Sequence, residues 1–182
     1  IGNIDDKYLE NAISDNMNAS DIPTAVKDAN IIMLLVPDQS QPTVFEEILK
    51  SKPANDCLIV VAHGYSIYHS NINMPEAYSV GMLAPRMPGA PIRDAYLRGS
   101  GIPAFFDVVK NSNGVAENQL IALAHAIGFT KGGLYSVPLA EPITNVVASK
   151  SNVSDFIVSE PPSNLSKLLL LPTTLNAPPP SR

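Results

Sequence analysis

The chain has 182 residues, a length that suits one globular domain with a sizeable hydrophobic core. Its formal net charge is −5 and it holds no block of basic residues, which argues against a nucleic-acid-binding protein. No apolar run approaches the roughly 20 residues of a membrane-spanning helix. The single cysteine, Cys57, cannot form an internal disulfide, which fits a reducing compartment. These features predict a soluble intracellular protein and do not distinguish the cytoplasm from a mitochondrion or plastid.

The two ends of the chain differ from its centre. The sequence begins with Ile1 rather than methionine and shows no signal-peptide pattern, which suggests a processed or truncated product. Prolines gather toward the other end, where residues 178–180 are all proline. We therefore expect a folded domain over residues 1–140 and an irregular, proline-rich tail over residues 141–182.

Apolar patterning predicts alternating helices and strands along the folded part. Helical spacing, capping residues and prolines predict helices over residues 5–16, 24–29, 92–97 and 115–127, and another that begins at Pro42. Short, mostly apolar runs predict strands over residues 31–36, 57–62, 80–84, 103–109 and 133–137. This alternation predicts an α/β domain with a mostly parallel sheet between flanking helices.

Polar or special residues follow the first three predicted strands. Asp38 and Gln39 follow the first strand, His63 the second and Arg86 the third. The carboxyl ends of parallel strands share one edge of the sheet, where ligands bind, so these residues are expected to converge. Asp38 also fits a turn or a cap for the helix at Pro42, and His63 also fits a structural histidine. Arg86 suits an anion, because its planar guanidinium pairs with phosphate or carboxylate.

Several motifs of known chemistry do not occur. The sequence has no Gly-x-Gly-x-x-Gly fingerprint, no Walker loop and no Gly-x-Ser-x-Gly elbow. Gly99-x-Gly101 leads into a predicted strand rather than a helix, so it is not a dinucleotide fingerprint. No pair of carboxylates has the spacing of a metal site on a helix.

Five segments resemble motifs of the ketol-acid reductoisomerase family in their order and approximate spacing. They are DANIIMLLVPDQSQP at residues 28–42, VAHGY at 61–65, LAPRMPG at 83–89, RDAYLRGSGIPA at 93–104 and AHAIG at 124–128. The resemblance implies a Rossmann-like NADP-binding domain, which in that family precedes an all-helical domain that supplies magnesium ligands. The family isomerises and reduces 2-acetolactate-type substrates in branched-chain amino acid biosynthesis.

The resemblance also implies roles for the residues at the strand ends. Pro37, Asp38 and Gln39 would lie beside the nicotinamide of NADP(H), and His63 would be the active-site histidine. Arg86 stands where the family has an active-site lysine, and we expect it to act with His63 in catalysis. The substrate would be a small 2-keto or 2-hydroxy acid.

The sequence departs from the family in four respects. The opening strand and glycine-rich turn, expected before Asp5, do not occur, so the pyrophosphate would lack its backbone cradle. Arg86 replaces lysine, and a planar fork is not interchangeable with a compact ammonium. The Asp-Leu-x-Gly-Glu-Gln metal motif expected after Thr144 is absent, and Asp155 and Glu160 do not reproduce its spacing. A short proline-rich tail stands in place of the helical domain.

Two functional interpretations therefore stay open. The first is an oxidoreductase domain whose nucleotide turn and metal site come from another segment or chain, so that this chain alone does not isomerise acetolactate. The second is a non-catalytic binding or assembly module derived from the same family. A sheet without its first strands exposes an edge beside residues 31–36, which favours pairing with a second copy or a complementing chain.

Overall fold

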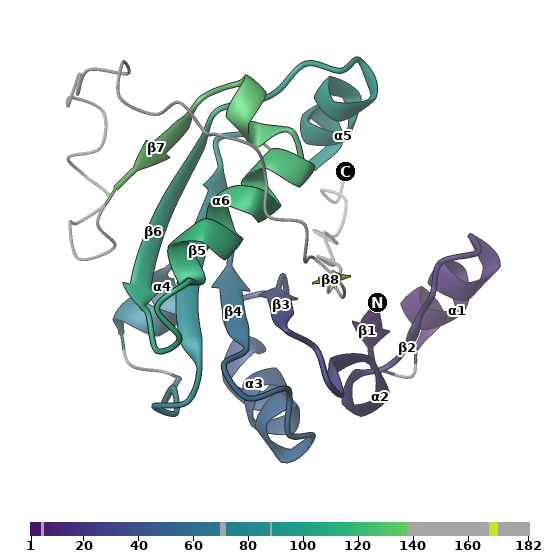
Figure 1. Ribbon diagram of the computed structural model, residues 1–182. Helices are drawn as coiled ribbons and strands as arrows, with labels where there is room; N and C mark the ends of the chain where they lie inside the picture. Colours follow the sequence, from purple (N-terminus) through teal and green to yellow (C-terminus); the bar gives the residue numbers. More distant parts are fainter. Residues whose placement is uncertain (5, 70–71, 88, 138–167, 171–182) are drawn as a thin grey trace, which may run out of the picture.

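The structure is a computed structural model that describes residues 1–4, 6–69, 72–87, 89–137 and 168–170. Its centre is a six-stranded sheet with the strand order β7-β6-β5-β4-β3-β8 (Figure 1). The strands are β3 (Ile31–Leu34), β4 (Leu58–Val61), β5 (Ser79–Pro85), β6 (Ala104–Lys110), β7 (Leu134–Ser136) and β8 (Leu168–Leu170). Neighbouring strands are parallel except for β5 and β6, which are antiparallel. The expected Rossmann-like, mostly parallel α/β fold is confirmed.

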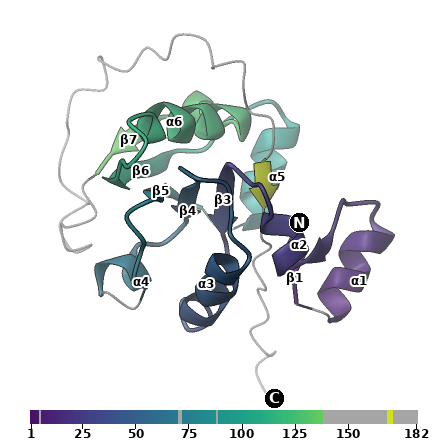
Figure 2. The ribbon, with the colours of Figure 1, turned by 60° about the horizontal axis from the view of Figure 1, so that its bottom comes forward.

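Helices cover both faces of this sheet (Figures 1 and 2). They are α2 (Ile22–Val26), α3 (Gln41–Lys50), α4 (Tyr65–Tyr68), α5 (Gly89–Leu97) and α6 (Ala116–Ala126). A further helix, α1 (Lys7–Ser14), lies apart from this sheet (Figure 1) and has no buried residue. The alternating side chains of β3 divide between two core clusters. Ile32 and Leu34 pack with α2 and α3, whereas Ile31 and Met33 pack with α5 and α6. An uncharged strand that is buried on both faces is what the composition of this run predicts.

Two short strands at the start of the chain form a separate sheet. β1 (Gly2–Asn3) precedes α1 in the chain and β2 (Ser20–Asp21) follows it, and the two strands pair in parallel. The carboxylate of Asp6 accepts hydrogen bonds from the first N–H groups of α1, and that of Asp21 accepts one from Thr24 N in α2. Capping of this kind satisfies backbone donors that a helix leaves without an internal partner.

Every helix and strand predicted between residues 5 and 137 is present, with bounds that shift by a few residues. The elements β1, β2, α4 and β8 are not indicated by the sequence, because elements of two to four residues carry no measurable periodicity. β8 lies within the segment 141–182, and the other residues of that segment lie outside the described residues. No helix in the described part of the chain is long and apolar enough to cross a membrane.

The edge of β3 differs from the expectation. We expected it to be open, but Ile31–Met33 pair in parallel with Leu168–Leu170 of β8. Figure 1 shows β8 on the side of β3 that faces β1. A strand edge presents unpaired N–H and C=O groups, and a second strand satisfies them. The expectation of an exposed edge along this stretch was therefore wrong.

We predict that Cys57 is unreactive in the folded protein. The residue is fully buried, and burial raises the pKa of its thiol from 9.0 to about 12. Ellman's reagent should therefore label Cys57 slowly in buffer and fast in urea, because the thiolate is the reactive form. Since the folded pKa is the higher one, this contribution to stability is present below about pH 9 and decreases as the pH rises toward about 12. Labelling of the native protein at the rate of the unfolded chain would contradict the prediction.

Candidate functional site

The loop between β3 and α3 is held by backbone and side-chain hydrogen bonds. The backbone N–H of Ser40 donates to Pro37 O at 2.8 Å, which closes a turn directly after the strand. Gln41, the first residue of α3, donates from Nε2 to Val36 O at 3.2 Å and to Asp38 Oδ1 at 3.1 Å. Ser40 is the N-cap of α3, and no side chain caps this helix. The carboxylate of Asp38 is therefore bonded to a side chain and does not cap the helix.

The carboxyl end of β4 brings His63 to the same loop. Its Nδ1 lies 3.5 Å from Asp38 Oδ2, and the side chains of His63 and Asp38 are 55% and 34% exposed. The backbone N–H of Tyr65, the first residue of α4, donates to the same Nδ1 at 3.3 Å. The buried Ser66 hydroxyl donates to Asp38 O at 3.4 Å and so ties α4 to the loop. The structure thus brings Asp38 and His63 together, as expected for the ends of neighbouring parallel strands.

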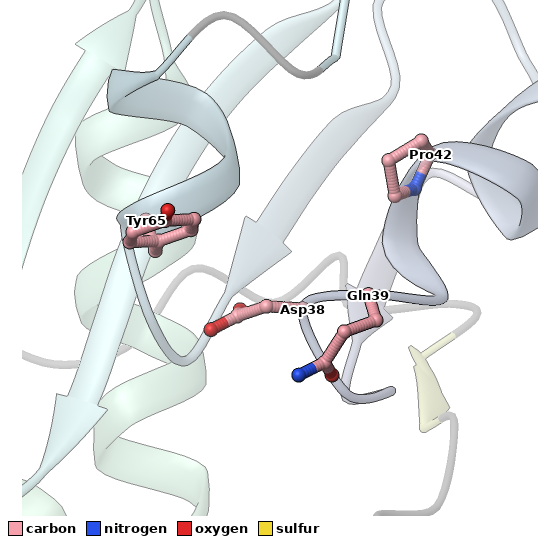
Figure 3. A pocket seen from close by; sticks show the side chains of 4 residues that line it. All are labelled: Asp38, Gln39, Pro42 and Tyr65. Atoms are coloured by element: carbon pink, nitrogen blue, oxygen red, sulfur yellow. The ribbon is translucent and has the colours of Figure 1, made fainter.

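An open pocket of about 420 Å³ lies between these two loops (Figure 3). Asp38 and Gln39 line it from the β3–α3 loop, Pro42 from the first turn of α3 and Tyr65 from the start of α4. Figure 3 shows the carboxylate of Asp38 extending toward the loop that leads into α4. The volume falls within the range of about 300–1,000 Å³ that is usual for small-molecule sites.

Arg86 lies at the same edge, immediately after β5. Its guanidinium carbon is 4.7 Å from the centre of the Phe105 ring, and its backbone N–H donates to Pro103 O at 3.0 Å. In the described part of the chain, no hydrogen bond or ion pair joins Arg86 to Asp38 or His63. Asp38 and His63, which follow β3 and β4, are therefore in contact, whereas Arg86, which follows β5, contacts Phe105 of β6.

Two backbone segments cross beside this edge, one just before β6 and the other just before β7. A Cβ atom at Gly101 would lie 2.3 Å from Gly132 N, and one at Gly132 would lie 2.2 Å from the carbonyl carbon of Ile102. Both distances are far below a van der Waals contact, and the opposing atoms belong to the backbone. Only glycine fits at either position, so this crossing fixes how β6 and β7 begin.

Comparison with known families matches residues 1–133 to the NADPH-binding domain of acetohydroxy acid isomeroreductase. The chain belongs to this family. It is 38% identical over 130 residues to the ketol-acid reductoisomerase of Methanothermobacter thermautotrophicus, a match that covers 71% of this chain and 40% of that protein. It is 34% identical over 135 residues to the enzyme of Pyrobaculum arsenaticum, with 74% of this chain and 41% of that protein covered.

A solved structure agrees with these relatives. The chain superimposes on an NADH-preferring ketol-acid reductoisomerase from an uncultured archean with a TM-score of 0.70 and 29% identity, which covers 76% of this chain and 42% of that one. The chain therefore spans about 40% of the length of the reductoisomerases that it matches. The resemblance inferred from the five sequence segments is confirmed.

The two cofactors that the family implies differ in how well the residues fit them. The open pocket lined by Asp38, Gln39, Pro42 and Tyr65 has room for the nicotinamide ring of a dinucleotide. Within the described ranges, no group of three or more His, Cys, Asp or Glu side chains could hold a metal ion. The described residues therefore do not fit a magnesium site.

Gln41, Tyr65 and Ser66 form hydrogen bonds with Asp38 or His63. The sequence alone does not indicate that these three residues are functional. Gln41 follows Asp38 by three residues at the start of a helix, a spacing from which its side chain can reach back to the carboxylate. That spacing was the available signal for Gln41. Tyr65 and Ser66 belong to the four-residue helix α4, whose approach to the β3–α3 loop depends on tertiary packing.

Proposed function

We propose that this chain is the NADP(H)-binding part of a ketol-acid reductoisomerase, with Pro37, Asp38 and Gln39 beside the nicotinamide. The observation that carries the proposal is the approach of Asp38 to His63 at an open pocket where parallel strands end. Parallel α/β sheets bind nucleotides at this edge. Membership of an NADPH-binding domain family supports the same cofactor.

The chemistry of the site follows from the Asp38–His63 pair. Bound NADPH supplies a hydride, and the protein orients the substrate and handles the accompanying proton. With its Nδ1 next to Asp38 Oδ2, the imidazole of His63 has Nε2 available to exchange a proton with a substrate oxygen. His63 thus acts as the general acid or base, and Asp38 orients its ring.

Arg86 completes the proposed site as an anion-binding group. A guanidinium that stacks on an aromatic ring keeps its N–H groups in the ring-parallel plane, where they can pair with a carboxylate. The position of the Arg86 guanidinium carbon over the Phe105 ring, 4.7 Å from its centre, supports such a role. The substrate class that fits is a 2-keto or 2-hydroxy acid, whose carboxylate Arg86 would hold.

Isomerisation is proposed to need more than this chain. The described residues hold no group that fits a metal ion, and the chain spans about 40% of its relatives. We infer that the remaining groups of the reaction come from another segment or chain.

Calorimetric titration of the purified chain with NADPH, and separately with NADH, tests the proposal. Micromolar binding of at least one of them, about −8 kcal/mol, is the expected result. A Gln39→Trp variant should weaken binding at least about tenfold by filling the pocket. Asn55→Trp introduces the same side chain at an exposed site before β4, at the end of that strand opposite to the pocket, and should leave binding unchanged.

Two outcomes would contradict parts of the proposal. If neither nucleotide binds at millimolar concentration, the chain does not hold the cofactor by itself. If the purified chain shows magnesium-dependent turnover of 2-acetolactate, the inference that other segments are needed is wrong.

A non-catalytic assembly module remains the second candidate, and one observation favours it. The helix α1 has no buried residue, and it exposes the apolar side chains of Ile13 and, just beyond its end, Met17. Such a surface suits contact with another chain. Light scattering on the purified chain would distinguish the candidates when combined with the titration, because a module should associate without binding nucleotide.

A further inference from the structure

Gln41 is the first residue of α3 and lies between two residues of the chain that line the open pocket, Gln39 and Pro42. Its side chain is among the few buried polar ones, with only 2% of the residue exposed. Its Nε2 amide group donates to Val36 O at 3.2 Å and to Asp38 Oδ1 at 3.1 Å. Its Oε1 has no hydrogen-bond partner among the described residues. Burying Oε1 without a hydrogen-bond partner costs stability. The presence of glutamine at this position therefore needs an explanation, which its two donated bonds can supply.

The orientation of this amide is determined by its surroundings. A carbonyl oxygen and a carboxylate oxygen accept hydrogen bonds and cannot donate them. If the amide were turned over, Oε1 would face both acceptors and repel them. The NH₂ group of Gln41 must therefore point at Asp38 Oδ1, and Oε1 must be the atom left unpaired.

This bond decides which oxygen of Asp38 faces His63. With Oδ1 held by Gln41, Oδ2 is the oxygen that lies 3.5 Å from His63 Nδ1. The backbone carbonyl of Asp38 is held separately by the hydroxyl of Ser66. The loop and the carboxylate are thus fixed by two different side chains, and Gln41 holds the carboxylate oxygen that does not face His63.

His63 Nδ1 lies close to one hydrogen-bond donor and one acceptor, which require different protonation states of this nitrogen. The backbone N–H of Tyr65, at 3.3 Å, donates to Nδ1 only when that nitrogen carries no proton. Asp38 Oδ2 accepts from Nδ1 only when that nitrogen carries one. The two neighbours therefore favour different tautomers of the neutral imidazole, and the position of the carboxylate decides between them.

We propose that Gln41 is a positioning residue that holds Asp38 toward His63 and thereby selects the tautomer with the proton on Nδ1. In this tautomer Nε2 is unprotonated and can accept a proton. Loss of Gln41 releases the carboxylate, so the hydrogen bond that Tyr65 N–H donates to Nδ1 is no longer opposed, and the proton moves to Nε2. The consequence for catalysis rests on the proposed function, whereas the effect on the tautomer does not.

Long-range ¹H–¹⁵N NMR of the histidine rings, at a pH where they are neutral, measures the tautomer directly. The signals of His63 are assigned by their loss in a His63→Asn variant. In Gln41→Met, which has a similar length and no donor, the ratio of Nδ1-protonated to Nε2-protonated ring should fall about tenfold, the factor that one net hydrogen bond supplies. Asp38→Asn should give a shift in the same direction, and the double variant should add nothing further.

The control is Gln119→Met, which removes a glutamine on α6 that accepts a hydrogen bond from Asn113 Nδ2. It should leave the His63 ratio unchanged. An unchanged ratio in a folded Gln41→Met variant would overturn the proposal. If that variant does not fold, Asp38→Asn decides instead, because an unchanged ratio there would show that the carboxylate does not select the tautomer and would overturn the proposal. These readings need no nucleotide, so a failure to bind NADPH would count against the proposed function and not against the role of Gln41.

Discussion

Replacing Gly132 by alanine is expected to destabilise the protein by more than about 3 kcal/mol, beyond the usual cost of overpacking. The φ angle of Gly132 is −95°, which alanine adopts readily, so backbone conformation is not the obstacle. The obstacle is contact, since the new Cβ would lie 2.2–2.5 Å from three backbone atoms of Ile102. No side-chain rotation can relieve this overlap, and the segments before β6 and β7 would have to separate.

Equilibrium unfolding in urea, followed by circular dichroism, measures this effect. Gly89→Ala is the matched control, because a Cβ there has no atom within 4 Å and the residue begins α5. This control should be neutral or stabilise the protein by up to about 1 kcal/mol, since alanine favours helix more than glycine does. A Gly132→Ala variant with the midpoint of the parent chain would show that the two segments do not cross as described.

Replacing Phe45 by alanine is expected to cost about 3–5 kcal/mol, the usual range for removing a buried aromatic side chain. Phe45 lies on the inner face of α3, is 2% exposed and belongs to the core cluster that covers β3. The helix it anchors begins with Gln41 and Pro42, which hold and line the site. Loss of this contact should therefore loosen the pocket as well as the core.

Glu46→Ala provides the comparison for Phe45→Ala. Glu46 is the next residue of the same helix and is exposed, so its replacement should change stability by less than about 0.5 kcal/mol. Urea unfolding of both variants gives the two free energies of unfolding. A cost below about 1 kcal/mol for Phe45→Ala would mean that α3 does not pack on β3 through this residue.

Much of the site could be predicted because it depends on local composition and on one topological rule. The run Ile31–Leu34 holds no charged residue, which allows burial on both faces and so predicts a central parallel strand. Parallel strands end at the same edge, and this predicts that Asp38 and His63 lie close together. The observed distance of 3.5 Å between Nδ1 and Oδ2 agrees with that expectation.

Other features escaped prediction for physical reasons. The residues of β6 are equally suited to either strand direction, so its antiparallel pairing with β5 depends on the path of the chain around α5. β8 contains three leucines that show no period, and its position depends on the available edge of β3. In the sequence Gln41 looks like an ordinary helix residue. Its side chain reaches Asp38 only because the chain turns between β3 and α3.

The sequence by itself therefore determined the family, the alternation of helices and strands, and the residues at the strand ends. These follow from short-range patterns of apolar residues and from the motifs that the chain carries. Only the tertiary structure decided which of those residues meet. It paired Asp38 with His63 through Gln41 and Ser66, placed Arg86 on Phe105, and brought Gly101 against Gly132. Such contacts join segments that are distant in the chain, and their distances are set by packing across the whole sheet.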